Sequence, residues 1–574
     1  MKLAYSLRPA AALIAFVALS LAACSRVEET PPAPLATPLA VATPRPTAGP
    51  PTATPLPRGG NLTVGLAQDV PDLRPWQPRS RAEEQLIGVL YSGLMRLDDE
   101  LRPLPDLAER FESTADGRVL TFTLRSGLSW HDGQPLNADD VKFTLDQLRT
   151  LPPTTTALLS DLRYIADITA PTSATVVLSL TERYAPLLAE LSLPILPRHL
   201  LQGRPLGELN LWDVAIGSGP FKLADRVPGQ SIVLERFDQF HRGPPLLDRV
   251  AFIVATDNEI TRNALAEEQL LLAELTWNAG QSIVGTLENL DSGAYAENGY
   301  YFLAFNLREG YPFADQNVRQ ALARAIDLPR LVETATKGQG QLIGSSAAPG
   351  SWADLTAPVV SGASFDEARS MLDAAGWVLP PGATIREREG IRLAGELFVR
   401  GDDERRVVAA RAIAEVGAGI GMQITVTPGD FATLILSKYA PPFSFDLLLG
   451  SWSNGAGDPG FADYAFYDPD DFALFHASQI NQGESDTRVT RNFVAFADSA
   501  YDNQSQAARQ LYGIEDRISA IRQTQTRIAT QLPYLYLWAD RISVVSNRKL
   551  KTLDGPVNLN TPVYMWNIER WYIQ

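Results

Sequence analysis

The clearest alternation of apolar and polar positions lies in residues 119–124, which read VLTFTL. A period of two is typical of a strand with one buried face. After Asn137 the period changes, because Val141, Leu145 and Leu148 fall on one face of a helix that Asn137 can cap. We therefore predict a strand, a turn and a helix in this region.

Three further stretches follow the same two periods. Behind Asp315, apolar residues at 318, 321, 322, 325 and 326 have helical spacing. Asp366 opens another predicted helix, which Gly376 ends. From about residue 395, a strand, a helix to about 416 and a second strand at 422–426 predict a βαβ unit. Such alternation predicts an α/β fold, with helices flanking mixed sheets in lobes around a cleft.

The N-terminal residues have a different pattern. Lys2 and Arg8 precede an apolar stretch that ends in LAAC, and Cys24 is the only cysteine of the chain. The stretch is shorter than the ~20 residues of a membrane-spanning helix and predicts a secretory signal peptide over residues 1–23. LAAC resembles the bacterial lipoprotein processing box, which implies acylation of Cys24. A generic cleaved signal or a short uncleaved anchor is the alternative.

Residues 24–58 are rich in proline, threonine and alanine, and almost uncharged. Proline removes backbone donors, so neither a helix nor a sheet can propagate. We interpret this stretch as a semi-rigid linker between the lipid and the body; a disordered tail is the alternative. The body, from Gly59, has more residues than a single hydrophobic core usually stabilises, so two or three lobes are expected.

Charge and motifs exclude several classes of function. A formal net charge of −16 argues against binding of nucleic acid. The four histidines, at 131, 199, 241 and 476, are too far apart for a short-spaced zinc motif. A GxGxxG match at 455–460 leads into a stretch broken by proline, which argues against a dinucleotide-binding turn. We expect no enzyme, no cofactor and no metal site. A secreted hydrolase with paired carboxylates is the remaining alternative.

Residues 126–148, SGLSWHDGQPLNADDVKFTLDQL, resemble the signature of the bacterial extracellular solute-binding proteins of family 5, the dipeptide and oligopeptide type. Trp130 to Val141 fit the signature at nearly every place. Other segments resemble the family in the same order: 91–95, 105–109, 194–199, 217–222, 242–248, 305–306, 313–322, 325–327, 368–377 and 458–459.

The resemblance implies a periplasmic-binding-protein-like fold of type II, class C, with two large lobes around a cleft and an extra inserted domain. Lobe I is expected to be discontinuous, the inserted domain II to follow its first segment, and lobe III to complete the body. The expected ranges are 59–100, 215–305 and 541–574 for lobe I, 101–214 for domain II and 306–540 for lobe III.

The function that the resemblance implies is that of a monomeric substrate-binding lipoprotein of an ABC importer. It would capture a di- or oligopeptide outside the cytoplasmic membrane and deliver it to the permease subunits. The lipid would hold it on the outer face of that membrane, in the periplasmic space. Alternatives on the same fold are binding of a nickel chelate, an oligosaccharide or another solute, and a role as a surface sensor or adhesin.

Four residues are candidates for ligand binding. Asp458 matches the family's Asp-Pro carboxylate that can hold a peptide's amino terminus, although it could merely start a turn. Trp452 is a candidate cleft aromatic or a core tryptophan. Asn306 follows the apolar run 301–305, where the family places a cleft-facing strand. Arg308 could pair with a ligand carboxylate or be a surface charge. No arginine matches the family's carboxylate anchor, and His131 is expected to pack a turn.

Overall fold

The computed structural model describes residues 57–78, 80–151, 157–354, 362–453, 467–483, 485–486 and 491–574. Cys24, the predicted linker up to residue 56, Asp458 and the GxGxxG match lie outside these residues. Within them, no helix has both the length and the apolar composition needed to cross a bilayer.

A large mixed sheet of twelve strands runs through the described body. Its spatial order is β18 (Gln423–Gly429), β17 (Ala394–Arg400), β19 (Leu447–Ser453), β13 (Gly299–Phe305), β20 (Tyr534–Asn547), β11 (Leu272–Thr276), β1 (Asn61–Leu66), β10 (Arg249–Val254), β9 (Ser231–Arg236) and β8 (Phe221–Val227). Two more strands, β12 (Leu290–Ala296) and β14 (Gly340–Leu342), also pair with β20.

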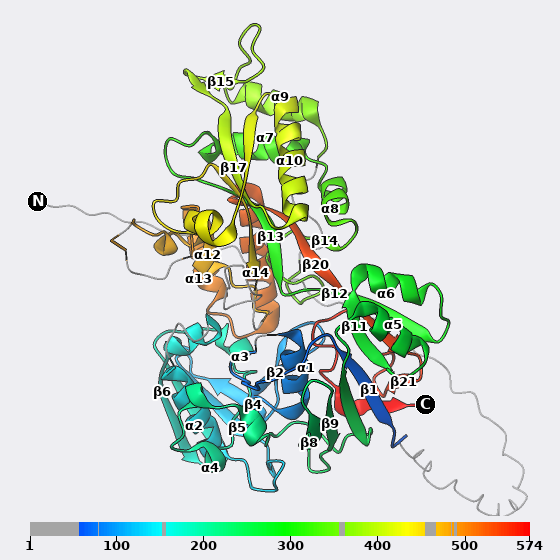
Figure 1. Ribbon diagram of the computed structural model, residues 1–574. Helices are drawn as coiled ribbons and strands as arrows, with labels where there is room; N and C mark the ends of the chain where they lie inside the picture. Colours follow the sequence, from blue (N-terminus) through cyan, green and yellow to red (C-terminus); the bar gives the residue numbers. More distant parts are fainter. Residues whose placement is uncertain are drawn as a thin grey trace, which may run out of the picture. The chain divides into compact units, whose positions relative to one another are not determined.

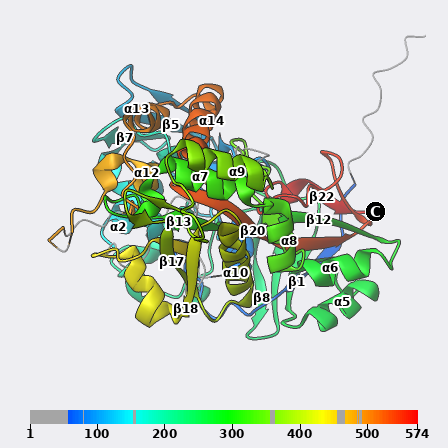
Figure 2. The ribbon, with the colours of Figure 1, turned by 90° about the horizontal axis from the view of Figure 1, so that it is seen from above.

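Strand β20 joins the two halves of this sheet. Its first part pairs with β13 and β14, and its second part pairs with β11 and β12. Figures 1 and 2 both show it as one long strand that continues from β13 to β12. The chain crosses a second time through residues 297–298, between β12 and β13. There the Glu297 amide donates to the carbonyl of Asp540 on β20 at 2.7 Å.

The region that resembles the family signature folds as its pattern predicts. Strand β5 (Val119–Leu124) alternates half-buried and buried residues within an antiparallel sheet of four strands, with β4 (Ala108–Ser113), β7 (Thr175–Leu180) and β6 (Ile165–Thr172). Helix α2 (Ala138–Arg149) begins at Asn137 with a reciprocal capping box to Asp140 and buries its apolar face. This predicted strand and helix are confirmed.

The other predicted helices are confirmed with one change of cap. Helix α7 (Gln316–Ala325) has Asp315 as its N-cap. Helix α9 (Phe365–Ala374) is capped by Ser364, while Asp366 lies in its first turn, because the serine hydroxyl accepts from the amide of Glu367. Gly376 follows the end of α9 with a φ of +82°. Strands β17 and β18 are parallel and joined by α10 (Glu404–Gly419), as expected for a βαβ unit.

The remaining helices lie around the sheets (Figure 1). They are α1 (Arg81–Leu90), α3 (Leu187–Glu190), α4 (Arg198–Leu201), α5 (Asn258–Ala266), α6 (Trp277–Val284), α8 (Leu328–Thr336), α12 (Phe472–Phe475), α13 (Ser499–Ala508) and α14 (Ile514–Gln531). The shorter strands form three pairs: β2 (Met95–Leu97) with β3 (Pro103–Pro105), β15 (Glu387–Arg388) with β16 (Ile391–Arg392), and β21 (Leu550–Thr552) with β22 (Trp571–Ile573).

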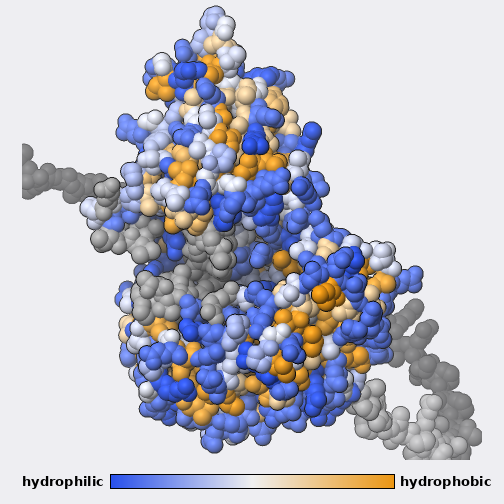
Figure 3. Space-filling view, viewed as in Figure 1, coloured by the Kyte–Doolittle hydropathy of each residue, from blue (hydrophilic) through white to orange (hydrophobic). Residues whose placement is uncertain are grey.

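The apolar side chains of the sheet divide into separate cores. Residues of β13, β19 and β20 alternate between a core with α7, α9 and α10 and an aromatic core on the opposite face. The first strand β1 shares a third core with the four-stranded sheet and α2. On the surface drawn in Figure 3, hydrophilic residues predominate and apolar residues are dispersed among them.

The expected lobe boundaries stay a prediction, because the whole of residues 57–574 clusters as one compact unit. The strand pairing adds one detail. Strand β13 falls inside the range expected for lobe I, but it pairs along its whole length with β19, whose residues were expected in lobe III. The sheet therefore favours a crossing point at residues 297–298 over one after residue 305.

Candidate functional site

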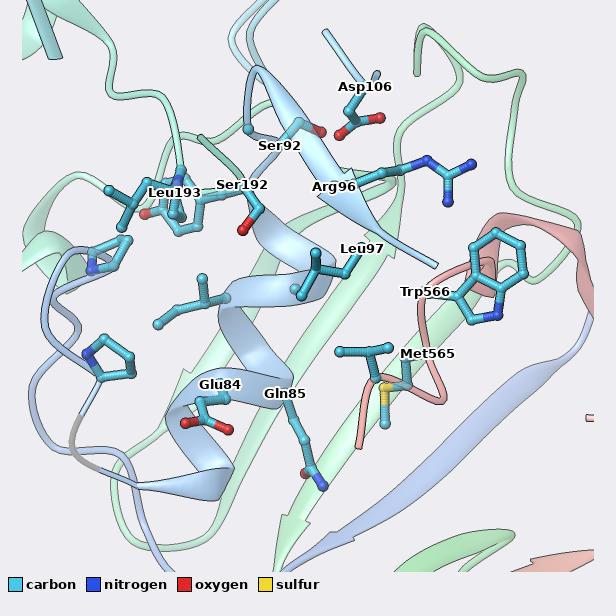
Figure 4. A pocket seen from close by; sticks show the side chains of 18 of the residues that line it. Glu84, Gln85, Ser92, Arg96, Leu97, Asp106, Ser192, Leu193, Met565 and Trp566 are labelled. Atoms are coloured by element: carbon cyan, nitrogen blue, oxygen red, sulfur yellow. The ribbon is translucent and has the colours of Figure 1, made fainter. Parts of the chain in front are cut away.

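A pocket of about 390 Å³ lies beside helix α1, within the size range of small-molecule sites. Its walls come from segments far apart in the chain: α1, β2 and the turn before it, residues 192–194, residues 562–566 and Tyr467. Figure 4 shows Glu84 and Gln85 on the helix, Leu97 and Met565 across from them, and Arg96 beside Trp566. The pocket thus combines a few charged groups with an apolar lining.

Helix α1 presents one face to the pocket and another to the core. Ser80 caps it by accepting from the amide of Glu83 at 3.2 Å. The pocket residues Arg81, Glu84, Gln85 and Gly88 follow the i, i+3, i+4, i+7 spacing of a single helical face. A Cβ placed on Gly88 would meet no atom within 4 Å, so this glycine leaves open space beside the pocket.

Arg81 is held by acidic groups on two sides. Its Nε lies 3.1 Å from Glu274 Oε1 on β11, and its Nη1 lies 3.0 Å from Glu84 Oε2. It also donates to the carbonyl of Pro562, and Tyr295 donates to Glu274 at 3.0 Å. Burial would lower the pKa of Arg81, but its interactions with Tyr295 and with the carboxylates of Glu274 and Glu84 outweigh it and raise that pKa well above its usual range.

The acidic character extends to the crossing of the two halves. Partial loss of water around its carboxyl group, the charge of Asp540 and then those of Glu84 and Glu274 raise the pKa of Glu297 to about 7, although the residue stays exposed at the surface. Arg81 carries one positive charge against Glu84 and Glu274, which leaves this end of the pocket negative.

A second charged group lies at Asp106, directly after β3. Its Oδ1 accepts from His241 Nε2 at 2.8 Å and faces Arg242 Nη1 at 3.3 Å. Arg242 also pairs with Glu569 at 3.2 Å. Burial would raise the pKa of Asp106, but Arg242, His241 and Arg96 lower it to about 2. Asp106 is therefore ionised, and its Oδ1 is engaged by His241 and Arg242.

Arg96 is different from these paired charges. Its guanidinium lies over the indole of Trp566, 4.9 Å from the ring centre. Among the residues that the structure describes, no carboxylate lies within ion-pair distance of it, and its buried Nε has no hydrogen-bond partner. Burial and the neighbouring charge of Arg242 lower the pKa of Arg96.

The structure gives the sequence-predicted residues Asn306 and Arg308 specific contacts within the protein. Asn306 is fully buried and donates to the carbonyls of Phe443 at 2.9 Å and Phe445 at 2.8 Å. Arg308 donates to Asn306 Oδ1 and to the Phe493 carbonyl at 2.8 Å, and lies 4.1 Å from the ring centre of Phe443. These contacts hold both side chains, while the buried Nη2 of Arg308 has no hydrogen-bond partner among the described residues, and the role of both residues in binding stays a prediction.

Trp452 lies in the same neighbourhood. Its indole is buried in the aromatic core and stacks with Phe302 at 6.1 Å and against Phe493 at 6.0 Å. The structure thus brings Trp452, Asn306 and Arg308 together around Phe493, but none of them lines the pocket beside α1. Asp458 lies outside the described residues, and its role also stays a prediction.

His131, in the signature segment, packs its turn as expected. Its Nδ1 accepts from the Gly217 amide at 3.1 Å, and its Nε2 lies 3.1 Å from the carbonyl of Gly219, to which it donates. Burial lowers the pKa of His131 to about 4, so the ring is neutral at physiological pH. Among the described residues, no group of three or more His, Cys, Asp or Glu side chains is placed to hold a metal ion.

Sequence reasoning missed the pocket residues Arg96, Glu84 and Trp566. The resemblance to the family did point to two segments of the pocket. Arg96 directly follows the family-like segment 91–95, and Arg242 begins the family-like segment 242–248. Trp566 lies outside every segment that was matched. The pocket could not be assembled from these segments alone, since its walls meet only in the folded chain.

A family model described as the bacterial extracellular solute-binding proteins, family 5 middle, matches residues 102–473. The oligopeptide-binding protein AppA of Bacillus subtilis is 25% identical over 90% of this chain and 92% of its own. Protein XP55 of Streptomyces lividans is 26% identical over 88% of each chain.

A solved structure with the same fold is HbpA2 of Haemophilus parasuis, with a TM-score of 0.74 and 18% identity over 90% of this chain and 100% of that one. NikZ of Campylobacter jejuni, solved with Ni(L-His), has a TM-score of 0.63 and 23% identity over 89% and 99%. These likenesses establish the fold, a mixed α/β architecture with a large sheet.

Proposed function

The chain belongs to the bacterial extracellular solute-binding proteins of family 5, and from that premise we propose that it captures a peptide in the pocket beside α1 for an ABC importer. The observation that carries the proposal is the polarity of the pocket. One end, beside Arg81, is negative, the other carries Arg96, and apolar side chains lie between them. A peptide in extended form offers an amino group, a carboxylate and side chains in the matching order.

Relatives support this reading. AppA of Bacillus subtilis is named for binding oligopeptides, and relatives in Brucella are named as putative peptide-binding proteins of ABC transporters. A relative in Escherichia coli is named for binding nickel, so a metal chelate is the ligand to test against. No step of the proposed function requires catalysis.

Closure around the ligand would use the two crossings of the chain. Residues 297–298 and the middle of β20 are the places where the large sheet passes from one half to the other. Bending at two such strands moves two packed bodies with little loss of core contact, as in hinge closure. We propose that the closed form is the one that permease subunits recognise, and that Asp458 contributes the amine contact that its family match implies.

Export and anchoring are proposed from the sequence. Acylation of Cys24 would hold the body on the outer face of the cytoplasmic membrane through the linker that ends at residue 58, and we propose that it acts as a monomer. Replacing Cys24 by alanine should move the protein from the membrane fraction to the soluble fraction of the cell without changing its ligand affinity. Retention in the membrane would contradict lipid anchoring.

The test of peptide capture is a thermal-shift and calorimetric survey of the purified protein. The panel contains di- to nonapeptides, Ni(L-His) and oligosaccharides. Ligand at 100 times Kd should stabilise the protein by about 2.7 kcal/mol. We expect peptides to produce the shift. A response to Ni(L-His) or a sugar alone would overturn the peptide assignment and keep the transport role.

A variant pair locates the site. Gly88→Phe should fill the pocket, because a side chain there points into open space, and should abolish the ligand-induced shift. Gly207→Phe is the matched control, since a Cβ at Gly207 also meets no atom within 4 Å and that residue does not line the pocket. Equal binding by both variants would place the ligand elsewhere.

A further inference from the structure

Three arginines line the pocket, and they differ in what their guanidinium groups meet. Arg81 faces Glu84 and Glu274, and Arg242 faces Asp106 and Glu569. Arg96 has only the face of Trp566. Two arginines of the pocket wall therefore each contact two carboxylates of the protein, whereas the third contacts none among the described residues.

The carboxylates nearest to Arg96 are engaged elsewhere. Asp98 pairs with Arg102 at 2.8 Å and also accepts from the amides of Glu100 and Arg102. Asp106 is shared by His241 and Arg242, and Glu569 pairs with Arg242. Within the described part of the chain, none of the three is within ion-pair distance of Arg96. The local structure therefore provides attraction from a distance but no direct partner.

The position of Arg96 makes this arrangement costly unless a partner arrives. The side chain is half-buried, and its Nε, like that of Arg242, is shielded from water and makes no hydrogen bond among the described residues, so a ligand would meet the outer nitrogens of the guanidinium. A buried donor without a partner loses its hydration and gains nothing in return. Contact with the ring face of Trp566 restricts the position of the guanidinium, and Figure 4 shows both groups on one side of the pocket above Met565. A planar fork held in this way is suited to a carboxylate, which can accept two parallel hydrogen bonds.

We propose that Arg96, oriented by Trp566, is the anchor for a carboxylate of the ligand, and that the pocket selects ligands in which a carboxylate adjoins an apolar group. The apolar group would lie on Met565 and Leu97. This inference rests on the proposed function for the identity of the ligand as a peptide. Its chemistry, a carboxylate on a stacked guanidinium, is the same for a C-terminal carboxylate, an acidic side chain and a small organic acid.

A purely structural role for Arg96 is the competing explanation. In that case the guanidinium would only cover the indole of Trp566, and its removal would weaken all ligands alike or none. A role in binding predicts a loss confined to ligands that carry the carboxylate. The comparison must therefore be made between ligands as well as between variants.

The experiment measures the Kd of matched ligands by isothermal titration calorimetry on the purified protein. Each peptide that binds is compared with its C-terminal amide and, where it contains glutamate, with the glutamine analogue. The variants are Arg96→Gln and Arg96→Lys. Arg548→Gln is the control, because Arg548 is an exposed arginine that pairs with Asp291 and does not line the pocket.

We expect Arg96→Gln to weaken the carboxylate-bearing ligand about 10- to 100-fold, the range of one charge-assisted hydrogen bond, and to change the neutral analogue less than about twofold. Arg96→Lys should restore part of the affinity, since lysine keeps the charge and loses the fork. Arg548→Gln should change the Kd of neither ligand. If the C-terminal amide binds the unmodified protein more weakly than its parent peptide, the carboxylate is the terminal one. If the glutamine analogue does so, the carboxylate is that of the side chain.

The outcomes separate this inference from the proposed function. If the Arg96 variants lose the same affinity for acid and neutral analogues, or lose none, the role of Arg96 is overturned and peptide capture is kept. If no peptide binds, the same variants are titrated with benzoate, phenylacetate and Ni(L-His). Binding of one of these that depends on Arg96 would support the carboxylate anchor and overturn the peptide assignment. Failure of every carboxylate probe to bind the unmodified protein would overturn both.

Discussion

Arg81 and Arg96 line one pocket, and the protein treats them in opposite ways. Arg81 contacts two carboxylates and a main-chain carbonyl, whereas Arg96 contacts the face of one indole. Burial favours loss of charge at both, but the acidic neighbours reverse the shift at Arg81, while the pKa of Arg96 is lowered. A charge with its partners in place supports the fold. A charge that is partly desolvated and lacks them is available for a ligand.

The largest expected effect comes from removing the paired arginine. Arg81→Met should lower the free energy of unfolding by about 2–4 kcal/mol, because Glu84 and Glu274 lose their partner; the value is below the full cost of a broken buried pair, since the Arg81 side chain is 26% exposed. Arg96→Met should change it by less than about 1 kcal/mol. Urea unfolding at neutral pH measures both. Equal losses would mean that Arg96 is as structural as Arg81.

A second test moves the comparison to carboxyl groups. Asp468 pairs with Arg517 at 2.6 Å and Asp470 with Arg509 at 2.8 Å, while Asp471 meets no cation among the described residues and hydrogen-bonds with Ser346. Burial, and then the charges of Asp470 and Asp468, raise the pKa of Asp471 to about 8. At neutral pH the folded protein therefore keeps a proton that the unfolded chain has lost.

The sign of the resulting pH dependence follows from proton binding. The folded state binds more protons than the unfolded state between the unfolded pKa near 3.9 and the folded pKa, so Asp471 makes stability fall as the pH rises through that window. From about pH 5 to about pH 8, the free energy of unfolding of Asp471→Asn should rise by about 2 kcal/mol relative to that of the unmodified protein. A single titrating group can contribute at most about 1.4 kcal/mol per pH unit. Urea midpoints at the two pH values test this. A constant difference between the proteins would contradict it.

The smallest expected effect concerns Gly88, which shares a helical face with Arg81. Glycine inside a helix is less favourable than alanine by about 0.5–1 kcal/mol, and a Cβ at this position would clash with nothing. Gly88→Ala should therefore stabilise the protein by that amount in thermal or urea unfolding. A gain in stability with a weaker ligand response would indicate that the pocket needs the space. Destabilisation would show that the helix face is packed after all.

Much of the fold could be predicted because its signals are local. The alternation in residues 119–124 and the cap at Asn137 decide their strand and helix over a few residues, and the structure follows them. The pairing of β20 with both halves of the sheet has no such signal, since its partners lie far away in the chain. Trp452 illustrates the same limit, because sequence cannot distinguish a cleft tryptophan from a core one.

The pocket required contacts between distant residues. Arg96 and Trp566 are adjacent only in the folded protein, and whether an arginine has a carboxylate partner is decided by the fold. The family-like segments placed Arg96 and Arg242 near matched residues without indicating which of them is paired. A resemblance therefore identified the class of protein, whereas the electrostatic difference between two similar side chains arises only in the folded structure.

The central position of β20 also bears on the order in which the protein is made. Strand β11 pairs with β1 on one side and needs β20 on the other, yet residues 277–533 are synthesised between them. Until Tyr534–Asn547 has left the ribosome, the first half of the sheet ends in an open edge. A chain whose sheet closes only with so late a segment remains incompletely folded for longer during synthesis, which is the state in which an exported polypeptide passes through a membrane channel.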